Sequence, residues 1–368
     1  MFGKKVILFG TGDYAKRLVE KIPWQIEYCV DNDQDKWGQK FFNIEIVSPE
    51  MLLKEMKEDI IIIIGSSYYG EITNQLNEFG LQENKHFFSY ESINTLQQFP
   101  AGHFYSPIPS KSSIKEIEGK IYDNNKEVKG VYLNVEEQLR LLKEISIYYK
   151  QIPYFNDCEK NLRYFFNNKF FDYSDAIIYY CMLCFLKPKK LIEVGSGFSS
   201  ALAIDVNELN FKNEIKMTFI EPYPDRLNKL LKDNDSHIIL EEKVQNVSLD
   251  IFKELDENDI LFIDSSHTAK AGSDVNYLIF EVLPRLKKGV YVHFHDVFWP
   301  FEYPKEWIYD GRSWNEVYLL RAFLQYNNTF SIKLWNQYLA EFYEAIFTEF
   351  MPQCLKNTGG SLWLRKEK

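Results

Sequence analysis

The chain has 368 residues, of which 45% are hydrophobic and 16% aromatic, and its formal net charge is −10. This length predicts two domains, each long enough to bury a core. The acidic balance and the lack of any Lys/Arg-rich stripe argue against a nucleic-acid partner.

The beginning of the chain, MFGKKVILFG, passes directly into a predicted strand and lacks the layout of a signal peptide. No apolar run approaches the ~20 residues that span a bilayer. Five cysteines are too few and too scattered for a disulfide framework. Cys181 and Cys184 lie in AIIYYCMLCFL, which predicts one face of a buried helix and not a metal or redox pair. We therefore expect a cytoplasmic protein with no membrane partner.

Residues 1–92 alternate between strand and helix patterns, which predicts a parallel, doubly wound, Rossmann-like module. The expected strands are 5–10, 26–33 and 59–67, and the expected helices are 13–22, 48–56 and 69–80. Residues 93–130 contain the proline-rich stretch QQFPAGHFYSPIPSKSS and are predicted to be a linker. Residues 131–368 are predicted to be a helical lead-in followed by a second α/β domain.

A glycine turn, GTGDYA, follows the first expected strand. It fits Gly-x-Gly-x-x-Ala, and Asp31 lies 21 residues after Gly10, a spacing typical of dinucleotide sites. However, the unit is expected to have only about four strands, and Asp13 lies where pyrophosphate would bind. The region resembles Rossmann-like modules of bacterial sugar-modifying and polysaccharide-biosynthesis enzymes. We favour a structural or acceptor-recognition role over an NAD site, which stays open.

The second domain has seven expected strands, and the first of them leads into a second glycine turn, LIEVGSGFSS. The strands are 190–195, 216–222, 236–242, 259–267, 289–296, 330–336 and 360–366. A Gly-x-Gly turn that opens a helix suits a nucleotide-like ligand, although the motif alone is weak. Its neighbours are more informative, because Glu193 precedes the turn and Glu221 ends the next strand. Two acids around a turn that lacks the diphosphate pattern favour a nucleoside with an amino-acid tail.

These features resemble the class I S-adenosylmethionine-dependent methyltransferases. The resemblance covers residues 190–368 and rests on EVGSGFSS, FIEPYPDRL, LFIDSSH and LPRLKKGVYVHFHDVFWP. It implies seven strands with the last antiparallel, and S-adenosylmethionine as cofactor. It also implies the cofactor-binding residues: Glu193, Gly195, Ser196 and Gly197 on the methionine side, Glu221 at the ribose and Gln245 at the adenine.

The expected catalytic residues follow the fourth and fifth strands of this domain. Asp264 and Asp296 are placed to share a divalent metal, as in metal-dependent sugar O-methyltransferases. However, His295 stands where such enzymes have an oxygen ligand, so the metal stays open. The alternative is a metal-free site with His267 or His295 as general base. His293 is expected to be a strand residue without a catalytic role.

Together these patterns predict methyl transfer to a hydroxyl group of a sugar or other small molecule, in polysaccharide or secondary-metabolite biosynthesis. Asp264, His267 and His295 are the predicted catalytic residues, and Trp299, Trp307 and Trp314 are expected to wall the acceptor site. The alternatives are an NAD-dependent oxidoreductase or epimerase, a non-catalytic nucleotide-binding protein, and metal-dependent oxidation on a methyltransferase-like fold. A homo-oligomer is left open.

Overall fold

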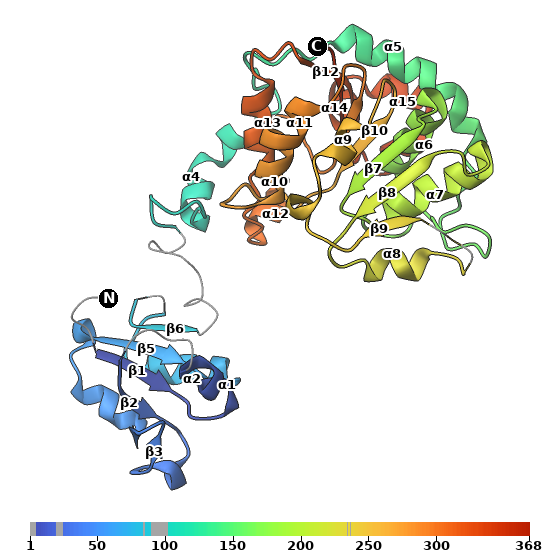
Figure 1. The fold of residues 1–368 in the computed structure, drawn as a ribbon. Helices are drawn as coiled ribbons and strands as arrows, with labels where there is room; N and C mark the ends of the chain where they lie inside the picture. Colours follow the sequence, from blue (N-terminus) through green and yellow to red (C-terminus); the bar gives the residue numbers. More distant parts are fainter. Residues whose placement is uncertain (1–4, 20–24, 84, 90–101, 234, 236) are drawn as a thin grey trace. The chain divides into compact units, whose positions relative to one another are not determined.

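The computed structural model describes residues 5–19, 25–83, 85–89, 102–233, 235 and 237–368 (Figure 1). The chain divides into two compact units, Met1–Ser113 and Ile114–Lys368. The end of the predicted helix 13–22 and the first part of the predicted linker, residues 93–101, lie outside the described residues.

The first unit is built on a mostly parallel sheet with the strand order β3-β4-β2-β1-β5-β6. Its elements are β1 (Lys5–Phe9), α1 (Asp13–Val19), β2 (Ile26–Val30), β3 (Lys40–Phe41), β4 (Ile44–Val47), β5 (Ile60–Ile64), α2 (Tyr69–Glu78) and β6 (Phe87–Ser89). Only the β3–β4 pair is antiparallel among the described pairs. The doubly wound sheet was predicted, whereas β3, β4 and β6 were not, because two to four residues are too few to show a period. The predicted helix at 48–56 is a short 3₁₀ helix, Pro49–Lys54.

The core of this unit explains the isoleucine run in β5. All five residues of Ile60–Ile64 are buried, as expected for a central strand covered on both faces. Alternate residues of β1 belong to different clusters: Ile7 and Phe9 pack on one face of the sheet, and Val6 and Leu8 on the other. This two-sided packing holds the carboxyl ends of β1, β2 and β5 at one edge.

The second unit carries a seven-stranded sheet in the order β12-β13-β11-β10-β7-β8-β9. Its strands are β7 (Lys190–Val194), β8 (Lys216–Ile220), β9 (Ile238–Leu240), β10 (Ile260–Ile263), β11 (Tyr291–Phe294), β12 (Phe330–Trp335) and β13 (Leu362–Lys366). β13 is antiparallel to both of its neighbours, and the other pairs are parallel. The predicted seven strands with the last one antiparallel are therefore confirmed.

Helices cover this sheet and, apart from α4, contribute residues to one continuous apolar core with it (Figure 1). They are α4 (Lys111–Ile121), α5 (Val135–Ile145), α6 (Tyr173–Leu186), α7 (Phe198–Phe211), α8 (Asp225–Leu230), α9 (Asp250–Lys253), α10 (Asp274–Tyr277), α11 (Leu283–Arg285), α12 (Lys305–Tyr309), α13 (Glu316–Leu324), α14 (Asn336–Phe342) and α15 (Glu344–Phe350). α6 holds Cys181 and Cys184, both buried, so the prediction of a core helix is confirmed. α4 lies inside the segment predicted to be a linker. In the part of the chain that the structure describes, every helix is too short or too polar to cross a bilayer.

Candidate active site

The candidate site follows the carboxyl ends of four neighbouring strands, β8, β7, β10 and β11. The last residues of these strands are paired in register. The next residues therefore form a row across the sheet edge, in the order Glu221, Gly195, Asp264 and His295. Backbone N–H groups of the last three donate to the carbonyl oxygens of the preceding strand ends in the row, at 3.0, 2.8 and 2.9 Å. Residues far apart in sequence thus lie about one strand spacing, ~4.8 Å, from each other.

The glycine turn is shaped by its contact with the neighbouring strand end. Gly195 has φ +82°, and a Cβ atom there would lie 1.9 Å from the carbonyl oxygen of Asp264. Only glycine fits this backbone and this space. At Gly197, a Cβ atom would lie 3.0 Å from Cδ of Arg226, so the second glycine also accommodates a close neighbour. The turn brings the backbone of residues 195–197 against both Asp264 and Arg226.

Glu193 lies fully buried beneath this turn. Its Oε1 accepts hydrogen bonds from the hydroxyl groups of Ser199 (2.6 Å) and Ser200 (2.9 Å). Its Oε2 has no hydrogen-bond partner among the described residues, and neither has the buried Oγ of Ser196. Burial raises the pKa of Glu193 to about 8, although the two serine bonds act in the opposite direction. A buried carboxyl group with an unpartnered oxygen can accept from a cationic ligand group, whose charge would favour the ionised form.

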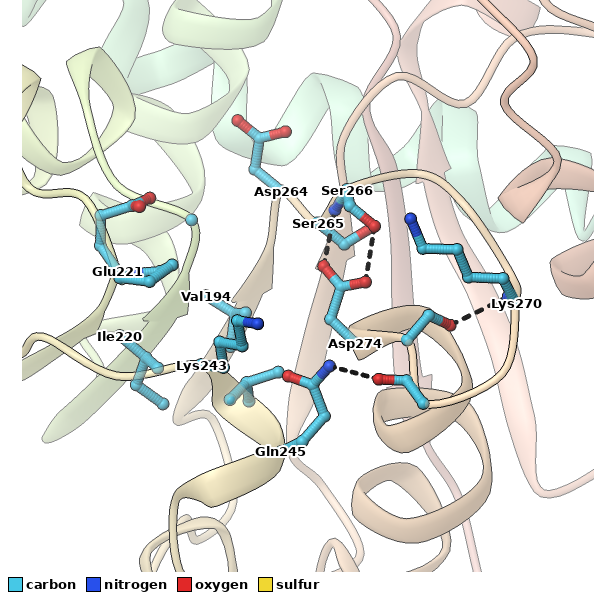
Figure 2. Close-up of a pocket in the computed structure, with 15 residues that line it drawn as sticks. Val194, Ile220, Glu221, Lys243, Gln245, Asp264, Ser265, Ser266, Lys270 and Asp274 are labelled. Atoms are coloured by element: carbon cyan, nitrogen blue, oxygen red, sulfur yellow. Dashed lines mark hydrogen bonds between the residues drawn. The ribbon is translucent and has the colours of Figure 1, made fainter. Parts of the chain in front are cut away.

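A cleft of about 380 Å³ opens beside the turn (Figure 2). Glu221 lies on one side of its opening, and Lys270 and Asp274 lie on the other. Asp274 holds the loop after β10 in place, because its carboxylate accepts from the backbone N–H (2.7 Å) and the hydroxyl (2.6 Å) of Ser266.

Two predicted cofactor residues line this cleft. Glu221 accepts from the backbone N–H groups of Ser196 (3.1 Å) and Tyr223 (2.8 Å), which fix its carboxylate next to the turn. Gln245 donates its side-chain amide to the carbonyl oxygen of Gly272 at 2.7 Å. This bond uses the amide nitrogen of Gln245 and leaves its amide oxygen as an acceptor.

A second cavity, of about 730 Å³, adjoins the cleft, since residues 264–266 line both. Trp307 and Trp314 form part of its wall, with ring centroids 5.4 Å apart in an edge-to-face arrangement. The expectation that Trp299 also walls this cavity is wrong. Trp299 is buried against Trp335 and Tyr338 and donates its indole N–H to the carbonyl oxygen of Asn124.

His267 lies buried on the wall of the second cavity, between carboxylates. Its Nδ1 is 2.8 Å from Oε2 of Glu316, and its Nε2 is 3.3 Å from Oδ1 of Asp264 and 3.6 Å from Oδ2 of Asp296. Burial lowers the pKa of His267, but the bonds to Asp264 and Glu316 outweigh it, so the pKa is raised well above the ordinary value. The backbone reinforces the pair, because the N–H of Glu316 donates to the carbonyl oxygen of His267.

The histidines of β11 and its end have different surroundings. His295 lines the second cavity, with Nε2 3.6 Å from Oδ1 of Asp296, and Asp296 with its neighbours raises the pKa of His295 against the effect of burial. His293 is fully buried and stacks on Phe262 with centroids 4.0 Å apart, and burial lowers its pKa well below the ordinary value. His293 is thus a core residue of the strand.

The donor set at Asp264 and Asp296 does not fit a divalent cation. Both carboxylates face the same imidazole nitrogen, Nε2 of His267. The bonds to Asp264 and Glu316 raise the pKa of His267 well above its ordinary value, which favours a proton on this nitrogen over a lone pair offered to a metal. Within the described residues, no group of three or more His, Cys, Asp or Glu side chains has the arrangement of a metal site.

Three residues of the site were not predicted from the sequence: Arg226, Arg312 and Glu316. Arg226 follows the acid at the end of β8 and contacts the glycine turn, and its guanidinium lies 4.0 Å from the ring centroid of Phe170. Glu316 reaches His267 from a helix 49 residues away. For Glu316 the sequence offers one signal. It is an acid at the start of a predicted helix, directly after an aromatic-rich loop, and an acid in that position can face the loop.

The first glycine turn also borders a cavity, of about 600 Å³, at the carboxyl ends of β1, β2 and β5. Asp31 accepts from the backbone N–H (3.0 Å) and the hydroxyl of Thr11 and from the ammonium group of Lys36 (3.1 Å). These three donors converge on one oxygen, and the backbone N–H of Asp33 donates to the other at 3.0 Å. Asp31 is therefore engaged on both oxygens by the protein itself.

Comparison with known proteins gives matches for both parts of the chain. Residues 192–297 match the family model described as a methyltransferase domain, and residues 2–87 match one described as C2185-like, N-terminal. An uncharacterized protein of Archaeoglobus fulgidus is 39% identical over 165 residues, which are 44% of this chain and 75% of that protein.

Solved structures of methyltransferases are similar to this chain at low identity. The plantazolicin methyltransferase BpumL with S-adenosylhomocysteine is 13% identical, with a TM-score of 0.37, over 70% of this chain and 98% of that one. The Podospora anserina methyltransferase PaMTH1 with the same ligand is 12% identical, with a TM-score of 0.35, over 70% and 97%.

The family match covers the glycine turn and the ends of β8, β10 and β11, where the row of candidate residues lies. The sheet around it has the seven strands, with an antiparallel β13, that this family requires. Residues 192–297 therefore form a methyltransferase domain, set in a seven-stranded sheet of the kind expected for class I S-adenosylmethionine-dependent methyltransferases.

Proposed function

We propose that this methyltransferase acts on a hydroxyl group of a small polyhydroxylated acceptor, such as a sugar. The observation that carries the proposal is the position of His267, whose Nε2 faces two carboxylates on the wall of the second cavity, beside the cleft at the glycine turn. Carboxylates suit the hydroxyl groups of an acceptor, and the faces of Trp307 and Trp314 suit its apolar side.

The cleft fits the parts of the cofactor. In the proposal, Glu221 accepts from the ribose hydroxyls, and the amide oxygen of Gln245 accepts from the adenine amino group. Oε2 of Glu193 and Oγ of Ser196, both buried without a partner, support binding of the cofactor's ammonium group. Arg226 has no ion pair among the described residues and contacts the turn, so we assign it to the cofactor's carboxylate. Gly195 and Gly197 let the backbone of the turn approach the ligand.

When bound, S-adenosylmethionine supplies a methyl group on a positively charged sulfur. The residues of the second cavity must align the acceptor hydroxyl and remove its proton. Glu316 holds Nδ1 of His267, which leaves Nε2 to accept the proton. Asp264 and Asp296 orient the hydroxyl group, and His295 moderates the charge of Asp296.

This assignment needs no metal. The raised pKa of His267 favours its protonated form. A general base must be neutral, so His267 has to lose this proton before turnover. In exchange, the imidazole is a stronger base once neutral. The reaction rate is therefore expected to rise with pH beyond neutrality, and to be the same in EDTA and in millimolar Mg²⁺.

The test has two arms. Calorimetry with S-adenosylmethionine measures cofactor binding, and formation of S-adenosylhomocysteine with a panel of hexoses, catechols, amines and thiols measures the acceptor class. We expect cofactor binding in the micromolar to millimolar range and transfer only to hydroxylated compounds. Transfer to amines or thiols alone would refute O-methylation, and a chelator-sensitive rate would refute the metal-free assignment.

A further inference from the structure

We propose that the acceptor carries an anionic group, a phosphate or a carboxylate, which is recognised by Arg312 at the wall of the second cavity. This inference rests on the proposed function, because it names the substrate class of the same site. Arg312 lies in the loop between α12 and α13, and its guanidinium is 4.3 Å from the ring centroid of Trp307 and 5.1 Å from that of Trp314. Its backbone N–H donates to the carbonyl oxygen of Trp307 at 3.1 Å. The two indole rings thus hold the guanidinium in one place.

Three cations line this cavity without an acid partner among the described residues. Among the described residues, the cations lining the cavity, Lys169, Arg226 and Arg312, have no ion pair. Of the five arginines of the unit that lie outside the cavity, Arg321 has no ion pair among the described residues, and the other four each pair with at least one carboxylate: Arg140, Arg163, Arg285 and Arg365. In a chain with a net charge of −10, acid partners are abundant. Three unpaired cations around one cavity therefore point to an anionic ligand.

The carboxylates that line the cavity do not form ion pairs with these cations. Asp264 and Asp296 face His267, and Asp175 accepts from the side chain of Asn336 (2.8 Å) and the backbone N–H of Gly360 (3.0 Å). The fourth carboxylate of the lining, Asp172, is hydrogen-bonded by the side chain of Asn357. Since Arg226 is assigned to the cofactor, Arg312 and Lys169 are left for the acceptor. A planar guanidinium binds phosphate or carboxylate through two parallel hydrogen bonds.

The cavity therefore combines three kinds of recognition: carboxylates for hydroxyl groups, indole faces for an apolar side, and an arginine for an anion. A sugar phosphate or a uronic acid has all three complementary features. The two differ only in the anion, so the experiment has an arm for each.

The test compares the affinities of glucose 1-phosphate, glucuronate and methyl glucoside at constant ionic strength. Tryptophan fluorescence reports binding, with S-adenosylhomocysteine present to fill the cleft. The variants are R312Q, which removes the charge, and R312K, which keeps the charge without the planar fork. R321Q is the control, because Arg321 lies on α13, has no ion pair among the described residues, and does not line the cavity.

We expect at least one anionic sugar to bind about 10-fold or more tightly than the neutral glucoside, the size of effect of one charge-assisted hydrogen bond. R312Q is expected to abolish this difference without weakening the glucoside, R312K to restore part of it, and R321Q to leave it unchanged. Preference for phosphate or for carboxylate identifies the anion.

The proposal is overturned if the three compounds bind equally, if none binds at millimolar concentration, or if R312Q weakens the glucoside as much as the anions. Its failure differs from failure of the proposed function. Methyl transfer to neutral hydroxylated acceptors with no preference for anions refutes this inference alone. Binding of anionic sugars without any binding of S-adenosylmethionine refutes the proposed function and leaves the anion site standing.

Discussion

The two glycine turns of this chain share one local bond and differ in what else surrounds it. In each, the backbone N–H between the two glycines donates to the acid that ends the next strand: Thr11 to Asp31 at 3.0 Å and Ser196 to Glu221 at 3.1 Å. Asp31 also binds the Thr11 hydroxyl and Lys36, whereas the one other donor to Glu221 among the described residues is the backbone N–H of Tyr223.

The difference shows that spacing alone is a poor guide to a nucleotide site. Glycine and acid spacing favours the first turn as a dinucleotide site, yet its acid is already neutralised by a lysine. The second turn has the less perfect spacing, but it keeps a backbone-oriented acid beside a cleft and a buried carboxylate with an unpartnered oxygen. The lone pairs that the protein leaves unused are the more informative feature.

The largest expected effect is a difference in stability between alanine variants of the first glycine in each turn, Gly195 and Gly10. Gly195→Ala places a Cβ atom 1.9 Å from a backbone carbonyl oxygen at φ +82°, so the second unit should lose about 4 kcal/mol of unfolding free energy. Gly10→Ala meets its nearest atoms at 3.1 Å at φ +101°, and should cost about 1–2 kcal/mol. Calorimetric unfolding of both variants checks this, and equal losses would show that the turns are equally tight.

The second effect is on cofactor affinity and concerns the acid that follows each turn in space, Glu221 or Asp31. Glu221→Ala should weaken binding of S-adenosylmethionine about 100-fold, because two charge-assisted hydrogen bonds to the ribose are lost. Asp31→Ala is the matched control and should leave that affinity unchanged. Titration calorimetry of the full chain with S-adenosylmethionine and with NAD measures both.

The same titrations test the rival function. NAD binding that is abolished by Asp31→Ala, with no binding of S-adenosylmethionine, would favour the oxidoreductase or epimerase alternative. Undiminished S-adenosylmethionine affinity in Glu221→Ala would place the cofactor in some other pocket.

Sequence patterns predicted most of the fold and part of the site. The strand and helix patterns predicted the order of elements in the second unit, and the ends of four strands predicted the row from Glu221 to His295. They did not predict Glu316 or Arg312, because a partner 49 residues away is set by how α13 packs on the loop after β10. Nor did they separate Trp299 from Trp307 and Trp314, since aromatic residues serve cores and cavity walls alike.

A third prediction uses the opposite pKa shifts at the two turns. The pKa of Glu193 is raised to about 8, so its folded form binds more protons than the unfolded chain between pH 4.5 and 8, and the unfolding free energy falls as pH rises through this window. Glu193→Gln removes this loss and should stabilise the second unit by about 2 kcal/mol at pH 8. It should also weaken cofactor binding, because the partner of the ammonium group is lost.

At the first turn the sign is reversed. Burial would raise the pKa of Asp31, but the bonds from Thr11, Asp33 and Lys36 lower it overall. Asp31 therefore contributes stability above the ordinary pKa of an aspartate, and this contribution is lost as the pH falls through its lowered pKa. Asp31→Asn should destabilise the first unit at neutral pH. Thermal unfolding from pH 2 to 9 measures both, and the same direction of change in the two variants would contradict the contrast.

The smallest effect concerns His267, the proposed general base beside the second turn. Among the described residues, no histidine lines the first cavity. If His267 accepts the acceptor's proton, kcat/KM should rise about 10-fold per pH unit until its raised pKa is passed. Glu316→Gln keeps a hydrogen-bond acceptor for Nδ1 but removes a charge that raises the pKa of His267. The rising limb should therefore move about one unit toward lower pH, while Glu71→Gln, at the first cavity, should not move it. A limb that stays in place, or a loss of rate that is equal at every pH, would assign Glu316 a purely structural role and leave another group as the base.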